Sequence, residues 1–278
     1  MSLDLTTLTP PAVIEPLDFE RILAEIKSDL LERYPEAADT LALESEPLTK
    51  LIETFAYREL LYRARVNDAA RAHLLAFAIG GDLDHLAALF GVVRMDGEDD
   101  DRLRLRLQLR IAALAGNGTA QHYEYHALSA SGNVRAARAT QLMPGSVHVV
   151  LWLIDATQNT AELVRDVLCD EARLMLGVIV SVGVARPRTI AVRARVWRAP
   201  TALPGLLDLL PTRLADALAQ RPLGGVVARS WVVAALHAAG VAAVEFMADD
   251  APPAATVLAD DEYPMLGAVE LIDGGVMG

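Results

Sequence analysis

The feature that most restricts the fold is a long stretch without helix-breaking residues. Between Pro47 and Gly80 the chain contains no further proline and no glycine. A helix over residues 47–79 would be roughly 50 Å long, since each residue of an α-helix adds about 1.5 Å. Two stripes of apolar residues follow it at helical spacing, one with Leu51, Phe55, Tyr62, Val66 and Ala69 and the other with Ile52, Ala56, Leu60 and Ala64. Two stripes exceed what one partner helix covers, so we expect a helix bundle that another chain can complete.

Shorter helices are predicted on both sides of the long one. Residues 17–34 place apolar side chains at helical spacing and end at Pro35. The proline-rich residues 1–16 before them predict an extended arm. Beyond the long helix, Asp82 suits the N-cap of a short helix that ends at Gly91.

The segment 102–116, with the sequence RLRLRLQLRIAALAG, fits two kinds of structure. Alternation of Arg and Leu is typical of a β-strand. The acidic residues 96–101 before it favour a helix, because carboxylates stabilise the positive end of a helix dipole. Gly116 also suits a helix end. We predict a helix.

After Gly118 helical and β-rich segments alternate. Thr119 suits the N-cap of a helix over 120–130, and other helices are predicted at 160–176, 203–220 and 231–239, the last capped by Ser230. The β-rich runs are 134–139, 147–154, 178–184, 190–197, 241–247 and 268–272. The predicted fold class is therefore α+β, with a helical N-terminal region that includes a long helix, followed by two small α/β modules. The expected divisions are an arm (1–16), a helical bundle region (17–116), the two modules (117–187 and 188–248) and a C-terminal acidic arm or short strand (249–278).

Composition narrows the class of protein. Apolar residues make up 53% of the chain and aromatic residues 5%, so Leu, Ala and Val must fill most of the core. The N-terminus has no signal-peptide pattern and no apolar run is long enough to cross a bilayer, which predicts no membrane partner and a chain made in a cytoplasm. The single cysteine, Cys169, predicts no disulfide within the chain.

Charge is distributed unevenly. The net charge of −12 argues against general affinity for nucleic acid. Residues 102–240 contain 16 basic and eight acidic residues, whereas residues 241–278 contain eight acidic and no basic residues. One interpretation is an ordinary solvated surface, and another is head-to-tail contact between copies through opposite charges.

The best candidate for chemistry is the pair His122 and His126. Histidines four residues apart share a helix face and could both bind a metal ion. Glu124 lies two positions after His122, whereas a zinc-protease motif has its glutamate directly after the first histidine, and no third ligand is evident. We therefore predict no catalytic residues, no cofactor and no metal. A metal-dependent hydrolase that uses His122 and His126 is the alternative hypothesis.

Three segments together resemble a known signature. These are residues 56–67 (AYRELLYRARVN), 75–87 (LAFAIGGDLDHLA) and 90–94 (FGVVR). They are similar to the baseplate J family of contractile phage tails and tailocins, in which Arg-x-Asn on a helix precedes an Ala-x-Gly-x-Asp-Leu-Asp turn and Gly-x-x-Arg. The doubled glycine at 80–81 departs from the usual single one. The resemblance spans roughly residues 20–247, and it is specific only around 57–94. It assigns structural roles to Arg58, Asn67, Gly80, Asp82, Leu83, Asp84, Gly91 and Arg94.

The resemblance implies a structural, non-enzymatic role. Members of the family are wedge components that join into a ring around the central spike of the baseplate. Expected partners are other copies of the chain, an I-type wedge protein and a W-type, lysozyme-like baseplate protein. The particle is a virion or tailocin assembled in the cytoplasm of a host bacterium. The long helix is expected in a bundle between subunits, with its interface at Leu51, Phe55, Tyr62, Arg65 and Val66.

Overall fold

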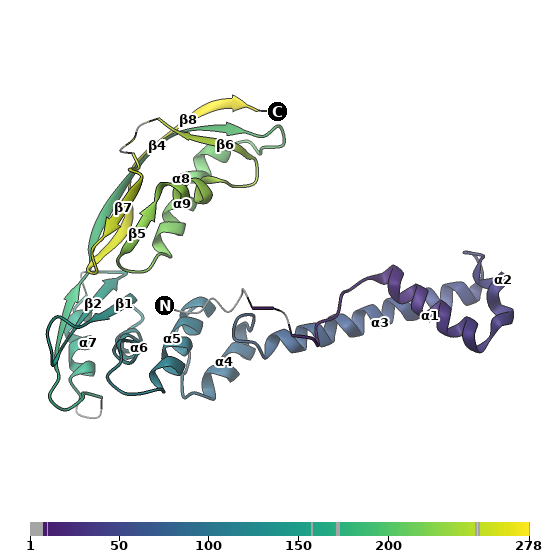
Figure 1. The fold of residues 1–278 in the computed structure, drawn as a ribbon, viewed down its shortest axis with the longest axis horizontal. Helices are drawn as coiled ribbons and strands as arrows, with labels where there is room; N and C mark the ends of the chain where they lie inside the picture. The colour runs from purple at the N-terminus through teal and green to yellow at the C-terminus, as the bar shows by residue number, and fades with distance from the viewer. Residues whose placement is uncertain are drawn as a thin grey trace. The chain divides into compact units, whose positions relative to one another are not determined.

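The structure is a computed structural model, and it describes residues 8–9, 11–156, 158–170, 173–247, 249 and 251–277. Residues 1–7 and 10 of the predicted arm lie outside the described residues. A helical N-terminal region is followed by strand-containing modules, which confirms the predicted α+β class (Figure 1). The chain forms two compact units, one ending at Arg104 and the other beginning at Leu105, so the division falls inside helix α5 (Asp100–Ala113).

The N-terminal unit is built around one long helix. Its elements are α1 (Phe19–Arg33), the 3-10 turn η2 (Pro35–Ala37), α2 (Ala38–Leu41), α3 (Pro47–Ala72) and α4 (Gly80–Ala88). The Asp18 carboxylate caps α1 by accepting a hydrogen bond from the Arg21 backbone N–H at 3.1 Å. Helix α1 packs along α3 over a small core that contains Ala37, Leu41 and Ile52.

Helix α3 ends at Ala72, seven residues before the predicted end. The chain then turns, and two carbonyl groups of this turn accept hydrogen bonds from the side chain of Arg104. Arg104 donates from Nε to the Leu75 carbonyl at 2.9 Å and from NH2 to the Ala78 carbonyl at 2.8 Å. A helix end without proline or glycine therefore depends here on an arginine 26 or more residues away in sequence.

Helix α4 begins at Gly80, so the prediction that Asp82 is its N-cap was wrong. The cap comes from Asp100, whose carboxylate accepts a hydrogen bond from the Gly80 N–H at 3.0 Å. Asp82 lies exposed in the first turn. The ambiguous Arg/Leu segment is helical, as predicted. Leu103 and Leu107, one turn apart on α5, are fully buried.

The first sheet belongs to the C-terminal unit and has the order β1-β2-β3. Strand β1 (Val134–Thr140) pairs antiparallel with β2 (Ser146–Leu153), and β2 pairs parallel with β3 (Ile179–Val184). Helix α7 (Thr160–Leu168) makes the crossover between the parallel strands, and α6 (Ala120–Ala130) packs with it over one face. The Thr119 hydroxyl accepts from the His122 N–H, which confirms the predicted cap of α6.

The second sheet has the long strand β4 (Arg186–Arg198) in its centre. β6 (Val241–Phe246) pairs with it antiparallel and β8 (Glu262–Val276) pairs with it parallel. Helices α8 (Leu206–Ala219) and α9 (Arg229–Leu236) contribute to the core on one face. Pro211 lies within α8 and does not split it, whereas α9 starts before Ser230, so the predicted Ser230 cap was wrong. β5 (Gly225–Ala228) pairs antiparallel with β7 (Ala255–Leu258).

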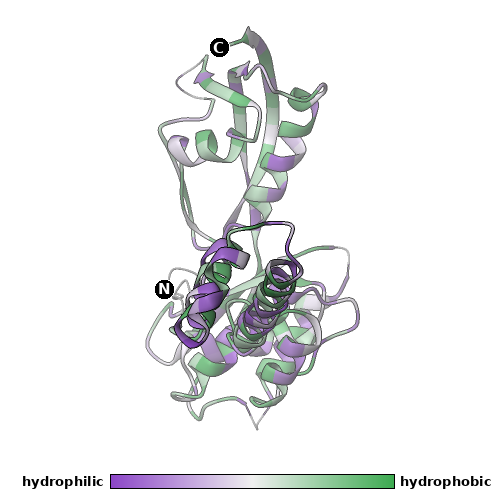
Figure 2. Cartoon of the chain, turned by 90° about the vertical axis from the view of Figure 1, so that its right-hand side faces the viewer, coloured by the Kyte–Doolittle hydropathy of each residue, from purple (hydrophilic) through white to green (hydrophobic). Residues whose placement is uncertain are grey.

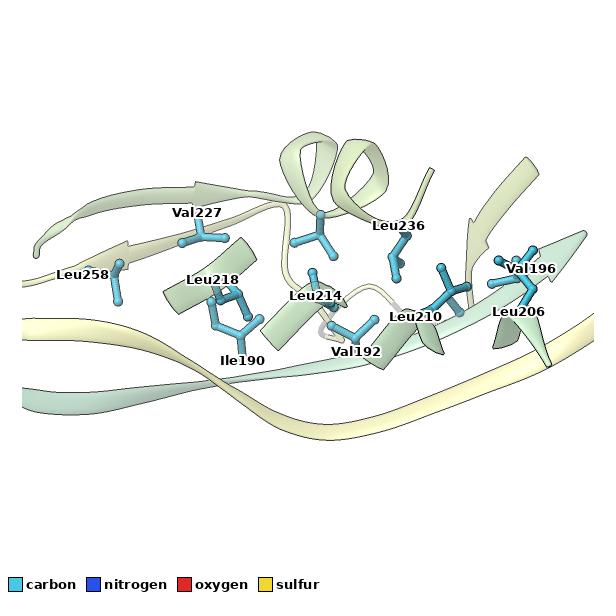
Figure 3. Packing of buried hydrophobic residues seen from close by; sticks show 12 residues of the cluster. Ile190, Val192, Val196, Leu206, Leu210, Leu214, Leu218, Val227, Leu236 and Leu258 are labelled. Atoms are coloured by element: carbon cyan, nitrogen blue, oxygen red, sulfur yellow. The ribbon is translucent and has the colours of Figure 1, made fainter. Parts of the chain in front are cut away.

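The core of this second part follows the alternation of β4. Ile190, Val192, Ala194 and Val196 are each at most 2% exposed, and they face leucines of α8 (Figure 3). Along α8 the buried leucines recur every fourth residue, at Leu206, Leu210, Leu214 and Leu218. In both units the helices carry hydrophobic as well as hydrophilic residues (Figure 2). This is expected for helices that bury one side and expose the other.

Strand β8 is 15 residues long, whereas the sequence predicts only a short strand at 268–272. Its acidic side chains pair with arginines of β4. Arg193 Nε lies 2.6 Å from Glu270 Oε2, and Arg198 NH2 lies 2.7 Å from Asp273 Oδ2. Some of the charges that suggested contact between copies are thus paired within one chain, and the contact itself remains a prediction.

The two three-stranded sheets of the C-terminal unit meet at a small apolar cluster. Trp152 of β2 stacks on Tyr263 of β8 with ring centroids 4.4 Å apart and an angle of 16° between the rings. Val150 and Leu223 complete the cluster. Arg138 of β1 reinforces it by donating to the Leu223 carbonyl at 2.7 Å and pairing with Asp260 at 2.8 Å. Where the modules divide remains a prediction.

Candidate protein interface

The two apolar stripes of α3 have different environments. One stripe is covered within the chain, where Ile52 is 4% exposed and Ala56 is fully buried. The other stripe is open to solvent, with exposed fractions of 52% for Leu51, 58% for Phe55, 67% for Tyr62 and 51% for Val66. Arg65 is also exposed on this side. We refer to Leu51, Phe55, Arg58, Tyr62, Arg65, Val66 and Ala69 as the open face of α3.

The open face leads into a groove between α3 and α4. Arg65, Ala69 and Ala72 line the groove from α3, and Leu86 and Leu89 line it from α4. Its volume is about 710 Å³. Leu89 is 77% exposed, so apolar surface continues from the helix into the groove. Polar residues line the groove as well, namely Asp68, His73, Asp82 and His85. An exposed apolar face that continues into a groove is typical of a site for another protein.

On its covered side, α3 also holds the chain segment before α1. Asn67, which is only 3% exposed, grips the backbone of Glu15 through two hydrogen bonds. The Glu15 N–H donates to Asn67 Oδ1 at 3.0 Å, and Asn67 Nδ2 donates to the Glu15 carbonyl at 2.8 Å. Arg63 adds ion pairs to Glu15 at 3.2 Å and to Glu25 of α1 at 3.5 Å. The hydrogen bond from Arg63 to Glu59 is the main cause that raises the pKa of the arginine.

Arg94 lies at a joint that connects three segments. Its Nε donates to Asp84 Oδ1 at 2.7 Å, its NH1 to the Glu98 carbonyl at 2.9 Å and its NH2 to Asp100 Oδ1 at 2.7 Å. Asp84 belongs to α4, Glu98 to the loop and Asp100 to the start of α5. The joint thus fixes α4 against the beginning of α5. Nε, NH1 and NH2 of Arg94 each donate to an acceptor of the chain itself.

The charges of the joint stabilise one another. Burial opposes the charge of Arg94, but hydrogen bonds to Asp84 and Asp100 outweigh it and raise the pKa of the arginine. The Gly80 N–H and then Arg94 lower the pKa of Asp100. A lowered carboxyl pKa means that Asp100 contributes stability at neutral pH. That contribution is lost only as the pH falls below the ordinary value of 3.8 and through the lowered one.

The histidine pair lies in a different environment. The His122 and His126 rings meet edge to face, with centroids 4.6 Å apart. His122 Nε2 donates to the Arg173 carbonyl at 3.2 Å, because a carbonyl can only accept. Burial, the neighbouring His122 and two arginines lower the pKa of His126 to about 4, so its ring is neutral at pH 7. Among the described residues, no three His, Cys, Asp or Glu side chains are grouped to hold a metal ion.

The comparisons with known proteins agree with this geometry. Residues 44–96, which include α3, α4 and Arg94, match the model of the baseplate J-like N-terminal domain. Baseplate protein J of Escherichia phage P2 is 34% identical over 301 aligned positions, which cover 98% of each chain. The chain belongs to the baseplate J family. It is a structural protein of a phage tail baseplate.

The structure places the motif residues of this J-family chain in two groups. Asn67 holds the N-terminal segment, whereas Gly80, Asp84 and Arg94 meet at the joint. Leu83 is fully buried one position before Asp84. Gly80 and Gly91 have φ values of +52° and +71°, a conformation that glycine adopts without strain. Arg58 lies apart from both groups, exposed on the open face of α3.

Three contributors to these sites were missed at the level of sequence. Arg63 and Asp100 act on segments 20 or more residues away, and Arg104 does the same for the turn after α3. In the sequence each of the three is only a charged residue in or next to a predicted helix, and such residues most often belong to the solvent-exposed surface. No described helix of this J-family chain combines the length and hydrophobicity needed to span a membrane.

Replacing Asn67 by alanine should release the segment around Glu15 from α3. Two hydrogen bonds to a buried amide are lost, which should lower the free energy of unfolding by about 1–3 kcal/mol. Limited proteolysis should then cut between residues 11 and 18 much faster than in the wild type. Replacement of the exposed Asp68 by alanine is the matched control. Equal cleavage rates in wild type and variant would contradict the proposed role of Asn67.

Proposed function

We propose that this baseplate protein is a wedge component of a contractile phage tail or tailocin, and that the open face of α3 is its contact with an I-type tail protein. The observation that carries the proposal is the exposure of four large apolar side chains on one side of α3. Burial of one such side chain stabilises an association by about 1.5–3 kcal/mol, so a few suffice for a tight complex.

The C-terminal unit supports a second contact, between copies of the chain in a ring around the central spike. Strand β3 lies at the edge of its sheet and contains no charged residue. Ile179 on this strand is 74% exposed, and Leu176 just before it is fully exposed. Isolated proteins usually protect such edges with charges, so an uncovered neutral edge favours a contact with another subunit. A W-type, lysozyme-like protein would be the neighbour toward the spike.

Replacing both Phe55 and Tyr62 by aspartate tests the contact through α3. Two charges would then have to be buried in the interface, so co-purification with the I-type protein should be abolished. The variant should keep a folded C-terminal unit, because both residues belong to the other unit. Co-expression with the I-type protein followed by size-exclusion chromatography measures the complex.

The matched control is the replacement of Tyr57 and Leu61 by aspartate. These residues are 53% and 43% exposed on another side of α3, and the control makes the same chemical change on the same helix. It should leave the complex intact. Wild-type yield of the complex with the Phe55→Asp, Tyr62→Asp variant would overturn the proposal.

A further inference from the structure

The open face of α3 has the spacing of a coiled-coil seam. Its residues recur at alternating intervals of four and three, at Leu51, Phe55, Arg58, Tyr62, Arg65 and Ala69, and all six are exposed. This interval pattern is the one with which one helix packs its side chains between those of another. The two arginines lie seven residues apart, at equivalent positions of the seam, where apolar residues are usual.

No hydrogen bond or ion pair joins either arginine to any part of the chain that the structure describes. Of the three acidic residues of α3, Glu53 pairs with Lys50 at 2.9 Å and Glu59 accepts from Arg63 Nε at 3.0 Å. The third, Asp68, is exposed and lines the groove together with Arg65. None of the three occupies a seam position, so both charged residues of the seam are cationic. This is unexpected for its surroundings, because residues 1–104 contain 21 acidic and 11 basic residues.

We propose that a helix of a different protein completes this seam, and that it carries carboxylates at two positions seven residues apart, facing Arg58 and Arg65. The inference rests on the proposed function of the open face and defines the chemistry of the partner. An arginine fork binds a carboxylate through two parallel hydrogen bonds. Two such pairs, set between apolar layers, determine which helix binds and in which register.

The same charges argue against a second copy as the occupant. Parallel packing of two α3 helices would place Arg58 against Arg58 and Arg65 against Arg65, and like charges across a seam are repulsive. Antiparallel packing would avoid these two contacts. It would still bring together two N-terminal units that each have an excess of acidic residues. A partner with carboxylates at the seam would instead face both arginines with the opposite charge.

The groove between α3 and α4 extends the surface for such a helix. Arg65 and Ala69 belong to both the seam and the groove. Leu86 and Leu89 provide apolar surface on the opposite wall. A partner helix that follows the seam would therefore meet these leucines at its end as well, in a site of about 710 Å³ that Asp68 and Asp82 also line.

Two synthetic helical peptides with the same apolar seam test the chemistry. One carries glutamate at the two positions seven residues apart, and the other carries lysine there. Fluorescence anisotropy with the full-length chain should show that the glutamate peptide binds at least roughly tenfold more tightly. Replacing Arg58 and Arg65 by glutamate should reverse this preference. Equal binding of both peptides, or binding of neither, would overturn the inference.

Binding of the I-type protein to variants of the chain distinguishes this inference from the proposed function. The Arg58→Glu, Arg65→Glu variant should no longer bind the I-type protein. The control replaces Arg21 and Arg33, which are exposed on α1, by glutamate. It changes the net charge by the same amount and should still bind the I-type protein. Suppose that the Phe55→Asp, Tyr62→Asp variant no longer binds the I-type protein but the Arg58→Glu, Arg65→Glu variant still does. The open face would then still be an interface, but the proposal of an acidic partner would be refuted. A dimer of the chain alone that the Arg58→Glu, Arg65→Glu change dissociates would also refute it.

Discussion

Replacement of Trp152 by alanine should lower the free energy of unfolding of the C-terminal unit by about 3–5 kcal/mol. The indole is only 7% exposed, stacks on Tyr263 and lies under the guanidinium of Arg135, 5.1 Å from Cζ to the ring. Alanine would leave a cavity where the two sheets meet. The loss can be measured by urea unfolding followed by circular dichroism.

Two features make the Trp152 prediction specific. Phenylalanine at this position keeps an aromatic ring for Tyr263, so Trp152→Phe should recover more than half of the loss. The N-terminal unit should be unaffected, because the apolar cluster around Trp152 contains only residues of the C-terminal unit. A loss below about 1 kcal/mol would show that the sheets are held together by other contacts.

The second large effect is expected at the joint. Arg94→Ala removes hydrogen bonds to Asp84, Asp100 and the Glu98 carbonyl, and it leaves two carboxylates close to each other without their cation. The free energy of unfolding of the N-terminal unit should fall by about 2–3 kcal/mol. Hydrogen exchange of the backbone amides of α4 should increase, because the cap at Gly80 depends on the position of Asp100.

Arg94→Lys separates charge from geometry. Lysine keeps the positive charge but lacks the planar fork that reaches three segments at once, so it should restore only a minor part of the stability. Full restoration would mean that a point charge suffices and that the directed hydrogen bonds contribute little. Arg71→Ala, an exposed arginine at the end of α3, is the neutral control.

The sequence predicted the elements whose signal is local. The acidic start before the Arg/Leu segment correctly indicated helix α5, and the hydroxyl of Thr119 correctly indicated the start of α6. The long helix was recognised from the absence of proline and glycine. In each case the decisive interaction lies within one or two helical turns, where spacing along the chain determines which side chains meet.

Contacts between distant segments could not be predicted in the same way. The end of α3 depends on Arg104, and the start of α4 depends on Asp100 rather than on the nearby Asp82. For strand β8, three glycines and a proline interrupt the β pattern, and its partner β4 lies about 75 residues earlier. The two apolar stripes of α3 were predicted from their helical spacing, but only the packing of α1 distinguishes the covered stripe from the open one. That the open stripe is an interface remains a prediction.

The position of β8 in the sheet has a consequence for the order in which the protein can mature. The long-range contacts described for the helices of the N-terminal unit all lie before residue 105, so these helices can form while translation continues. Strand β4 must wait for residues 262–276, which are synthesised after it and after the whole segment between them. Until then several of its arginines lack their carboxylate partners. The sheet that contains β4 is thus completed only once residues 262–276 have been made, so a chain terminated before them cannot present a finished C-terminal unit to the growing particle.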